Sequence, residues 1–250
     1  MKDDVHTDHQ TPSMCAEEIA RLKEYYAQRD ITMPWHDWHL NMYHPRHPLG
    51  FLFFEHHHAI LIEALNKLQI SLENYRILDI GCGYGHWLRF LVELGAAPER
   101  MAGVDISTER LAIARKANPA IAWIKTAGNN LPFAPASFDL VMQILVFSSI
   151  RSSDLRKTIA DAIVRVTKSG GYLFWIDHQR SLGDGLVGFS RADVLSYFPG
   201  MRIVYTMPVQ PRYFRFFYRT AGWFARLLYG WTKRWCDSWF LILQKSTSGI

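Results

Sequence analysis

The sequence predicts an α/β protein built around a doubly wound, mainly parallel sheet. A short apolar run at 77–80 is followed by a glycine-rich loop and a helical pattern at 86–94. A second apolar run, at 101–105, ends in the acid Asp105. Further apolar runs alternate with helical patterns up to residue 177, as is typical of parallel strands joined by helices. The length of 250 residues suits one such domain with additions.

The glycine-rich loop places Gly81, Gly83 and Gly85 at alternate positions directly after the first run. Glycine has no Cβ, so the backbone of this loop turns tightly and approaches a ligand closely. The N–H groups at the start of the following helix would point at the same ligand. Asp79 stands two residues before the loop, at the carboxyl end of the run. This segment therefore predicts a binding site for a nucleotide-containing cofactor.

Five motifs between residues 75 and 177 resemble, in their order, those of the class I S-adenosylmethionine-dependent methyltransferases. They lie at 78–85, 103–107, 131–133, 137–141 and 166–171. The resemblance implies a Rossmann-like sheet of seven strands, with the last strand antiparallel between the fifth and the sixth. It also implies S-adenosylmethionine as the cofactor and methyl transfer as the reaction. A nicotinamide site fits less well, because the pattern is D-x-G-x-G-x-G rather than G-x-G-x-x-G.

The resemblance further implies which residues hold the cofactor. Asp105 would bind the ribose hydroxyls, and the glycine loop would approach the amino-acid part. Many family members carry an acid at the position of Ala127 that contacts the adenine amine. Here Asn129 or Asn130, or a backbone carbonyl and amide, could replace that contact. Each asparagine could instead belong to a polar turn. The predicted cofactor residues are Asp79, Gly81, Cys82, Gly83, Gly85, Asp105, Ile106, Asn129, Asn130, Leu131 and Gln143.

The other elements follow from local patterns. Helical patterns at 15–28, capped by Ser13, and at 51–68 precede the first strand. In the family this region covers the cofactor as a lid, so we expect an N-terminal helical lid at 1–70 and the cofactor-binding domain at 71–250. Strands are expected at 121–124, 138–143, 172–177, 202–205 and 238–244, and helices at 108–117, 154–167 and 191–197. Residues 168–171 are expected to form the turn into the fifth strand.

Gln143 and two histidines are the candidate polar residues on the acceptor side. Gln143 ends an apolar strand at the edge where ligands bind, and the alternative is a satisfied buried amide. His178 follows the fifth strand at the same edge and could accept a proton from a hydroxyl during methylation, or be a plain loop histidine. His57 or His58 could line the pocket, because their helix leads into the first strand. The candidate catalytic bases are therefore His178 and His57.

The histidines are concentrated near the N-terminus, where nine of the eleven precede residue 59. Imidazole is the commonest transition-metal ligand, but these spacings match no ligand pattern. The consecutive histidines at 56–58 cannot all share one helical face. We therefore expect surface and lid histidines rather than a metal site.

The positive charge is concentrated near the C-terminus. Residues 201–250 hold eight Lys and Arg against one acid, so the net charge of this segment is +7. Residues 1–200 carry −2, and the whole chain carries +5. A helical insertion is expected at 207–237, with Arg212, Arg215, Arg219 and Arg226 on one face and aromatic residues on the other. Three interpretations stay open for it. The helix packs its aromatic face on the core, lies on an anionic membrane, or binds an anionic substrate.

The cysteines and the absence of certain segments indicate where the protein is located and which functions are less favoured. The three cysteines form no disulfide or metal spacing, and the sequence shows neither a signal peptide nor a run of 18 apolar residues. We expect a cytoplasmic protein, with peripheral membrane contact through 207–237 as an option. The expected activity is O-methylation of a small molecule, a sugar or a glycolipid precursor. Nucleic acid is an unfavoured partner, because no N-P-P-[FYW] tetrapeptide follows the fourth strand. An RNA-modifying enzyme and a non-catalytic cofactor-binding scaffold remain the alternatives.

Overall fold

The computed structural model describes residues 11–34, 36–37, 44, 46–181, 185–211 and 236–247. Its strands are β1 (Ile77–Ile80), β2 (Met101–Asp105), β3 (Ala122–Lys125), β4 (Phe138–Ile144), β5 (Thr167–His178), β6 (Met201–Pro211) and β7 (Cys236–Lys245). Its α-helices are α1 (Thr11–Thr32), α2 (Pro48–Leu68), α3 (His86–Glu93), α4 (Thr108–Ala117), α5 (Ser153–Val166) and α6 (Arg191–Tyr197). Two short 3₁₀ helices are η1 (Pro98–Arg100) and η2 (Phe147–Ser149).

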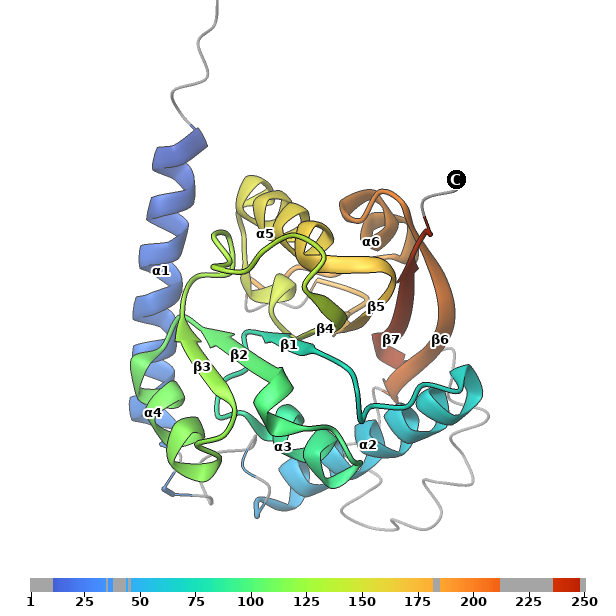
Figure 1. The fold of residues 1–250 in the computed structure, drawn as a ribbon. Helices are drawn as coiled ribbons and strands as arrows, with labels where there is room; N and C mark the ends of the chain where they lie inside the picture. The colour runs from blue at the N-terminus through green and yellow to red at the C-terminus, as the bar shows by residue number, and fades with distance from the viewer. Residues whose placement is uncertain are drawn as a thin grey trace, which may run out of the picture.

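The strands form one seven-stranded sheet in the order β3-β2-β1-β4-β5-β7-β6 (Figure 1). β1 to β5 pair in parallel, and β7 runs antiparallel to both of its neighbours, β5 and β6. This arrangement confirms the predicted Rossmann-like sheet, including the place of its last strand. The chain leaves β1 for β2 on one side and later returns to β4 on the other, so the strand order reverses beside β1.

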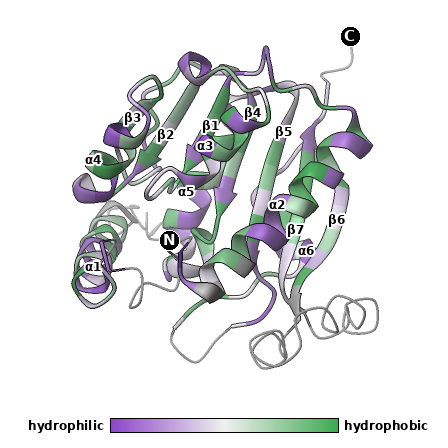
Figure 2. Ribbon diagram, turned by 90° about the horizontal axis from the view of Figure 1, so that it is seen from below, coloured by the Kyte–Doolittle hydropathy of each residue, from purple (hydrophilic) through white to green (hydrophobic). Residues whose placement is uncertain are grey.

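Helices cover both faces of the sheet, because successive side chains of a strand point to opposite sides. On β4, Val141 belongs to the core shared with α1, α5 and α6, whereas Leu140 and Met142 belong to the core shared with α2, α3 and α4. Strands buried on both faces are continuous apolar runs, as the sequence showed. In Figure 2 the green, apolar residues run along the central strands, whereas α1 is largely purple.

Both N-terminal helices are longer than the sequence predicted. α1 begins at Thr11, so the prediction that Ser13 caps this helix is wrong, and Ser13 lies within the first turns. Pro12 is tolerated there because the first turn of a helix has no intrahelical partner for its N–H groups. Proline likewise begins α2. The helical pattern predicted at 51–68 is confirmed, and Leu61 and Leu65 of α2 are buried, as expected for a helix with one apolar face on the core.

Two predicted boundaries in the C-terminal half are wrong. β5 begins at Thr167, and the expected turn at 168–171 is an irregularity within the strand, since pairing passes from Phe138↔Thr167 to Leu140↔Tyr172. β6 continues to Pro211 and β7 begins at Cys236, so both ends of the expected insertion at 207–237 are strand. β6 contains Pro208 and Pro211, which are tolerated because β6 is the edge strand of the sheet.

The remaining part of the expected insertion, 212–235, lies outside the described residues together with its four arginines. Its helical form and its contact with core, lipid or substrate therefore stay predictions. Within the part of the chain that the structure describes, no helix has both the length and the apolar character needed to cross a bilayer.

The glycine loop after β1 is packed tightly against its neighbours. Gly81 and Gly85 have φ angles of 70° and 73°, in the left-handed region that favours glycine. A Cβ on Gly81 would lie 2.4 Å from Cγ2 of Val146, and one on Gly85 would lie 2.3 Å from the ring of Trp123. The loop therefore needs glycine for its conformation and for the space beside it.

Helix α2 carries a buried histidine on its apolar side. His57 has no exposed surface, and its Nδ1 lies 2.6 Å from the carbonyl oxygen of Phe53, one turn earlier. Nδ1 therefore donates its hydrogen to this carbonyl. Burial, together with the neighbouring His56, lowers the pKa of His57 to about 3. The ring is neutral in the folded protein at ordinary pH.

We expect Gly85→Ala to lower the free energy of unfolding more than Gly95→Ala does. Both positions have positive φ, which costs an alanine about 1–2 kcal/mol. A Cβ on Gly95 would meet no described atom within 4 Å, whereas one on Gly85 collides with Trp123 and adds about 1–3 kcal/mol. Urea unfolding of the two variants measures the difference. Equal losses would show that Trp123 does not restrict the loop.

We expect His57→Gln to flatten the loss of stability on acidification. Unfolded histidine takes up a proton as the pH falls below about 6.5, whereas the folded His57 ring stays neutral down to about pH 3. Between pH 7 and pH 5 this difference lowers the free energy of unfolding by about 2 kcal/mol in the wild type. The exposed control His36→Gln should keep the wild-type slope. If the free energy of unfolding of His57→Gln fell with pH as steeply as that of the wild type, His57 would not be the buried neutral histidine inferred here.

Candidate functional site

A cavity of about 230 Å³ lies at the carboxyl ends of β1, β2 and β4. In doubly wound sheets ligands bind at this edge, where the strand order reverses. The walls come from both N-terminal helices, the glycine loop, the start of α4 and the segments after β3, β4 and β5. The cavity is lined by residues that include Tyr26, Asp30, Met33, Phe53, Phe54, Gly81, Cys82, Tyr84, His86, Asp105, Ile106, Arg110, Thr126, Ala127, Gly128, Leu145, Ser149, His178 and Leu186.

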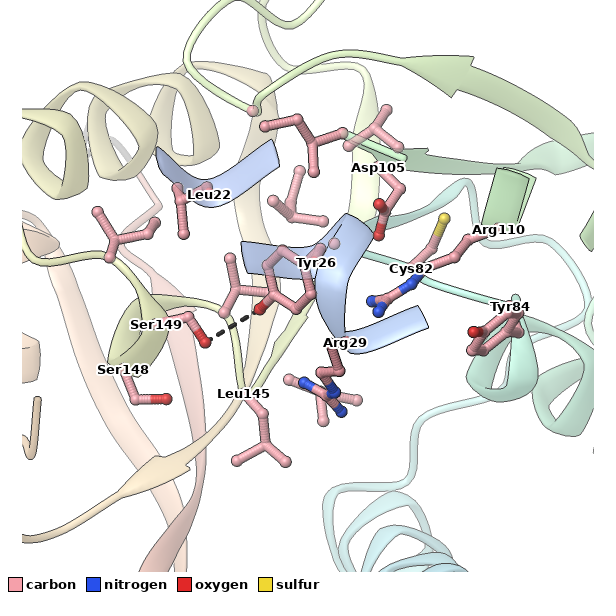
Figure 3. A pocket seen from close by; sticks show the side chains of 18 of the residues that line it. Leu22, Tyr26, Arg29, Cys82, Tyr84, Asp105, Arg110, Leu145, Ser148 and Ser149 are labelled. Carbon is pink, nitrogen blue, oxygen red and sulfur yellow. Dashed lines mark hydrogen bonds between the residues drawn. The ribbon is translucent and has the colours of Figure 1, made fainter. Parts of the chain in front are cut away.

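The carboxylate of Asp105 joins β2 to the glycine loop. Its Oδ2 accepts a hydrogen bond of 2.8 Å from the backbone N–H of Gly83, and its Oδ1 accepts one of 2.8 Å from Ser107. The side chain reaches the cavity, where Figure 3 shows it. Burial raises the pKa of Asp105, and these two N–H groups and Arg110 oppose the increase. Each oxygen keeps a further lone pair for hydroxyl donors, as ribose binding requires.

A second acid lies beneath the loop. Asp79 is 1% exposed, and its Oδ2 meets no hydrogen-bond partner among the described residues. Burial and the nearby Asp105 raise the pKa of Asp79 well above the ordinary value. Asp79 is absent from the described cavity wall, so its direct contact with the cofactor stays a prediction. The carboxylate of Asp105 and the glycine loop fit S-adenosylmethionine.

The remaining predicted cofactor residues divide into two groups. Cys82 and Ile106 line the cavity beside Gly81 and Asp105. After β3, the cavity wall is formed by Thr126, Ala127 and Gly128, whereas Asn129 and Asn130 follow beyond it and Leu131 is buried in the core. A contact of either asparagine with adenine stays a prediction.

Gln143 is buried and holds the segment after β4 in shape. Its Oε1 accepts hydrogen bonds from the backbone N–H groups of Val146 and Phe147, at 3.0 and 3.4 Å. Its Nε2 donates to Ile176 O and to Asp177 Oδ2, both at 3.4 Å. This geometry matches the alternative of a satisfied buried amide. Gln143 thus shapes the cavity wall without lining it.

Leu145, directly after β4, has a φ of 57° and lines the cavity. A positive φ costs a leucine energy, and such strained residues occur at functional sites more often than elsewhere. The backbone N–H of Leu145 donates to Ile176 O at 2.8 Å, which ties the strained residue to β5. No pattern in the sequence predicted the left-handed conformation of Leu145.

The two predicted bases lie in different places. His178 lines the cavity at the end of β5, and its Nδ1 lies 3.3 Å from the hydroxyl of Ser238 on β7. Its backbone N–H donates to the buried Asp177. His57 is buried in α2 and is absent from the described cavity wall. The structure therefore brings His178 to the cofactor residues and leaves His57 in the core.

A third histidine, His86 of α3, lines the cavity and pairs with His58. Their Nε2 atoms lie 3.0 Å apart, so one ring donates and the other accepts. Burial lowers the pKa of His86 to about 3 and that of His58 to about 4, so both rings are neutral at ordinary pH. Among the described residues, no group of three or more His, Cys, Asp or Glu is placed to hold a metal ion.

Helix α1 closes the cavity with polar contacts. Its Tyr26 hydroxyl donates to Ser149 Oγ at 3.0 Å, as the dashed line in Figure 3 shows. Arg21 donates to Ser149 O at 2.7 Å, and Glu18 accepts from the backbone N–H of Arg151. The helical pattern at 15–28 predicted this helix, but not its contact with the segment after β4. That contact depends on where the helix lies in the fold.

Comparisons with known proteins agree on the family. Residues 77–171 match a family model described as a methyltransferase domain. Phthiotriol/phenolphthiotriol dimycocerosates methyltransferase 1 of Mycobacterium ulcerans (strain Agy99) is 25% identical over 176 residues, which are 67% of this chain and 56% of that protein. The chain spans about half the length of the curated relatives it matches first.

Solved structures share the fold at low sequence identity. An S-adenosylmethionine-dependent methyltransferase from Mesorhizobium loti has a TM-score of 0.55 at 19% identity, over 73% of this chain and 96% of that one. The [4+2]-cyclase SpnF has a TM-score of 0.57 at 18% identity, over 76% of this chain and 81% of its own. The fold alone therefore does not fix the reaction. The family match, the five ordered motifs and the acid-tipped cavity together identify residues 77–171 as a class I S-adenosylmethionine-dependent methyltransferase domain.

Proposed function

We propose that this protein transfers a methyl group from S-adenosylmethionine to a hydroxyl group of a small molecule or a lipid-type acceptor. The observation that carries this proposal is that His178 lines the same cavity as Asp105 and Gly81. A potential proton acceptor and the cofactor-binding residues thus share one enclosure. Without such a base, the cavity would support cofactor binding but not the removal of a hydroxyl proton.

S-adenosylmethionine supplies a methyl group that is activated by the positive charge of its sulfonium. Asp105 binds the ribose hydroxyls, and the glycine loop approaches the amino-acid part. Helix α1 covers the cavity and limits the access of water, which would compete with the acceptor. Holding the acceptor close to the cofactor replaces a bimolecular encounter by an oriented one.

Methyl transfer would break the sulfur–methyl bond of S-adenosylmethionine and form a carbon–oxygen bond on the acceptor, leaving S-adenosylhomocysteine and one proton from the hydroxyl. His178 takes that proton on Nε2 when its Nδ1 carries the ring hydrogen and donates it to Ser238. Ser238 is 1% exposed, so this partner is itself held in the core. His57 has no part in this proposal, because it is buried away from the cavity.

The acceptor side of the cavity is mostly apolar. Met33, Phe53, Phe54, Leu145 and Leu186 contribute to its wall. Apolar walls with a few polar groups suit an organic acceptor whose hydroxyl is directed by one base. The name of the Mycobacterium ulcerans relative, a dimycocerosates methyltransferase, supports a lipid-type acceptor. Neither feature favours a nucleic acid.

We expect Asp105→Ala to weaken the binding of S-adenosylhomocysteine at least about tenfold, because two hydroxyls lose a charged acceptor. Isothermal titration calorimetry of the wild type and the variant measures this change. The control is Asp161→Ala, which removes an exposed carboxylate on α5 and should bind as the wild type does. Equal affinity of Asp105→Ala and the wild type would show that the ribose assignment is wrong.

We expect His178→Gln to retain the affinity for S-adenosylhomocysteine and to lower kcat by about 10²- to 10⁴-fold. The assay measures release of S-adenosylhomocysteine with a panel of hydroxylated acceptors, over a range of pH. A wild-type rate and pH profile in the variant would exclude His178 as the base. Tight cofactor binding without transfer to any acceptor would instead favour the non-catalytic scaffold.

A further inference from the structure

An ion pair fastens the end of α1 to α4 beside the cofactor carboxylate. The guanidinium of Arg110 donates to Asp30 through Nε, 2.9 Å from Oδ2, and through Nη2, 2.5 Å from Oδ1. The two side chains are 11% and 23% exposed, so solvent reaches the pair only in part. A two-point contact between a planar guanidinium and a carboxylate fixes orientation as well as distance.

Two tyrosine rings enclose the same guanidinium. The centre of the Arg110 guanidinium lies 4.6 Å from the ring centroid of Tyr26 on α1 and 5.4 Å from that of Tyr84 in the glycine loop. The Tyr84 hydroxyl also donates to Asp30 Oδ1 at 3.2 Å. Helix α1, the glycine loop and α4 therefore meet at one cation.

Asp105 lies next to this cation. Arg110 and Asp105 line the same cavity, and Figure 3 shows the Arg110 side chain extending toward Tyr26 with Asp105 beside it. The positive charge of Arg110 opposes the increase in the pKa of Asp105 that burial causes. Even so, every hydrogen bond that the described residues record for the Arg110 side chain is donated to Asp30. The guanidinium is directed away from the carboxylate that would bind ribose.

We propose that Asp30 is a positioning residue for the cofactor: by holding Arg110, it leaves the Asp105 carboxylate open to the ribose hydroxyls. This inference rests on the proposed function, because it requires a cofactor ribose at Asp105. When α1 is displaced, Arg110 loses Asp30 and pairs with Asp105, the nearest remaining acid at the cavity. Binding of the cofactor and closure of α1 then favour the same state.

The test compares S-adenosylhomocysteine binding by Asp30→Asn with binding by the double variant Asp30→Asn/Arg110→Met. Both variants lack the ion pair that holds α1, but only the single variant keeps a cation that competes for Asp105. Calorimetry gives the dissociation constants at pH 8, where Asp105 is ionised more fully than at neutral pH. Asp30→Glu tests rescue by a carboxylate, and Glu24→Gln is the matched control, an exposed acid on the same helix.

We expect a loss of at least tenfold in affinity for Asp30→Asn, with most of it recovered in the double variant and in Asp30→Glu. Equal weakening in the single and double variants would overturn the inference, because a merely structural contact of α1 predicts that result. Wild-type affinity in Asp30→Asn would overturn it too. If the wild type itself bound no S-adenosylhomocysteine, the proposed function would fail and this inference with it.

Discussion

The site depends on how the glycine loop is hydrogen-bonded to the end of β2. The N–H groups of Gly81 and Cys82 both donate to Val104 O, at 2.8 and 3.0 Å, and that of Gly83 donates to Asp105 Oδ2. Three successive donors thus follow one strand end. Because β1 and β2 pair in parallel with Ile80 opposite Val104, both strands end at the same level. The loop and the acid lie together because of this register.

This arrangement brings two acids together in the core. Asp79 and Asp105 are both buried, and Asp105 makes the charged form of Asp79 less favourable. Backbone donors and Arg110 compensate Asp105, whereas nothing described compensates Oδ2 of Asp79. Arg110 lines the same cavity as two acids, Asp30 and Asp105, and its side chain donates its hydrogen bonds to Asp30.

The parts of the fold that the sequence predicted are those encoded locally. The glycine loop, Asp105 and the ends of the first two strands lie within one short stretch of the chain, so the motifs there predicted both the loop and the acid. The burial of His57 could also have been predicted, because His57 lies on the same helical face as Phe54 and Leu61. The prediction instead placed His57 in the pocket, because its helix leads into the first strand.

The parts that were missed depend on tertiary placement. Arg110 occupies the first turn of a polar helix and gives no sign that it is buried, because its partner Asp30 lies eighty residues earlier. The extent of β6 was missed because prolines interrupt its pattern, and only its edge position makes them acceptable. The position of α1 over the cavity could not be predicted either. The helical periodicity of its sequence indicates an apolar face, but not which part of the fold this face packs against.

The walls of the cavity come from two sources. The matched domain, 77–171, supplies the glycine loop, Asp105 and Leu145, whereas α1, α2 and His178 lie outside it. Most of the residues predicted to bind the cofactor therefore lie within the matched domain, whereas most of the proposed acceptor side comes from the flanking segments. Evolution could exchange the flanking segments for a new acceptor while the central domain stays intact. Grafting the flanks of a relative onto this domain would be the corresponding way to redirect its chemistry.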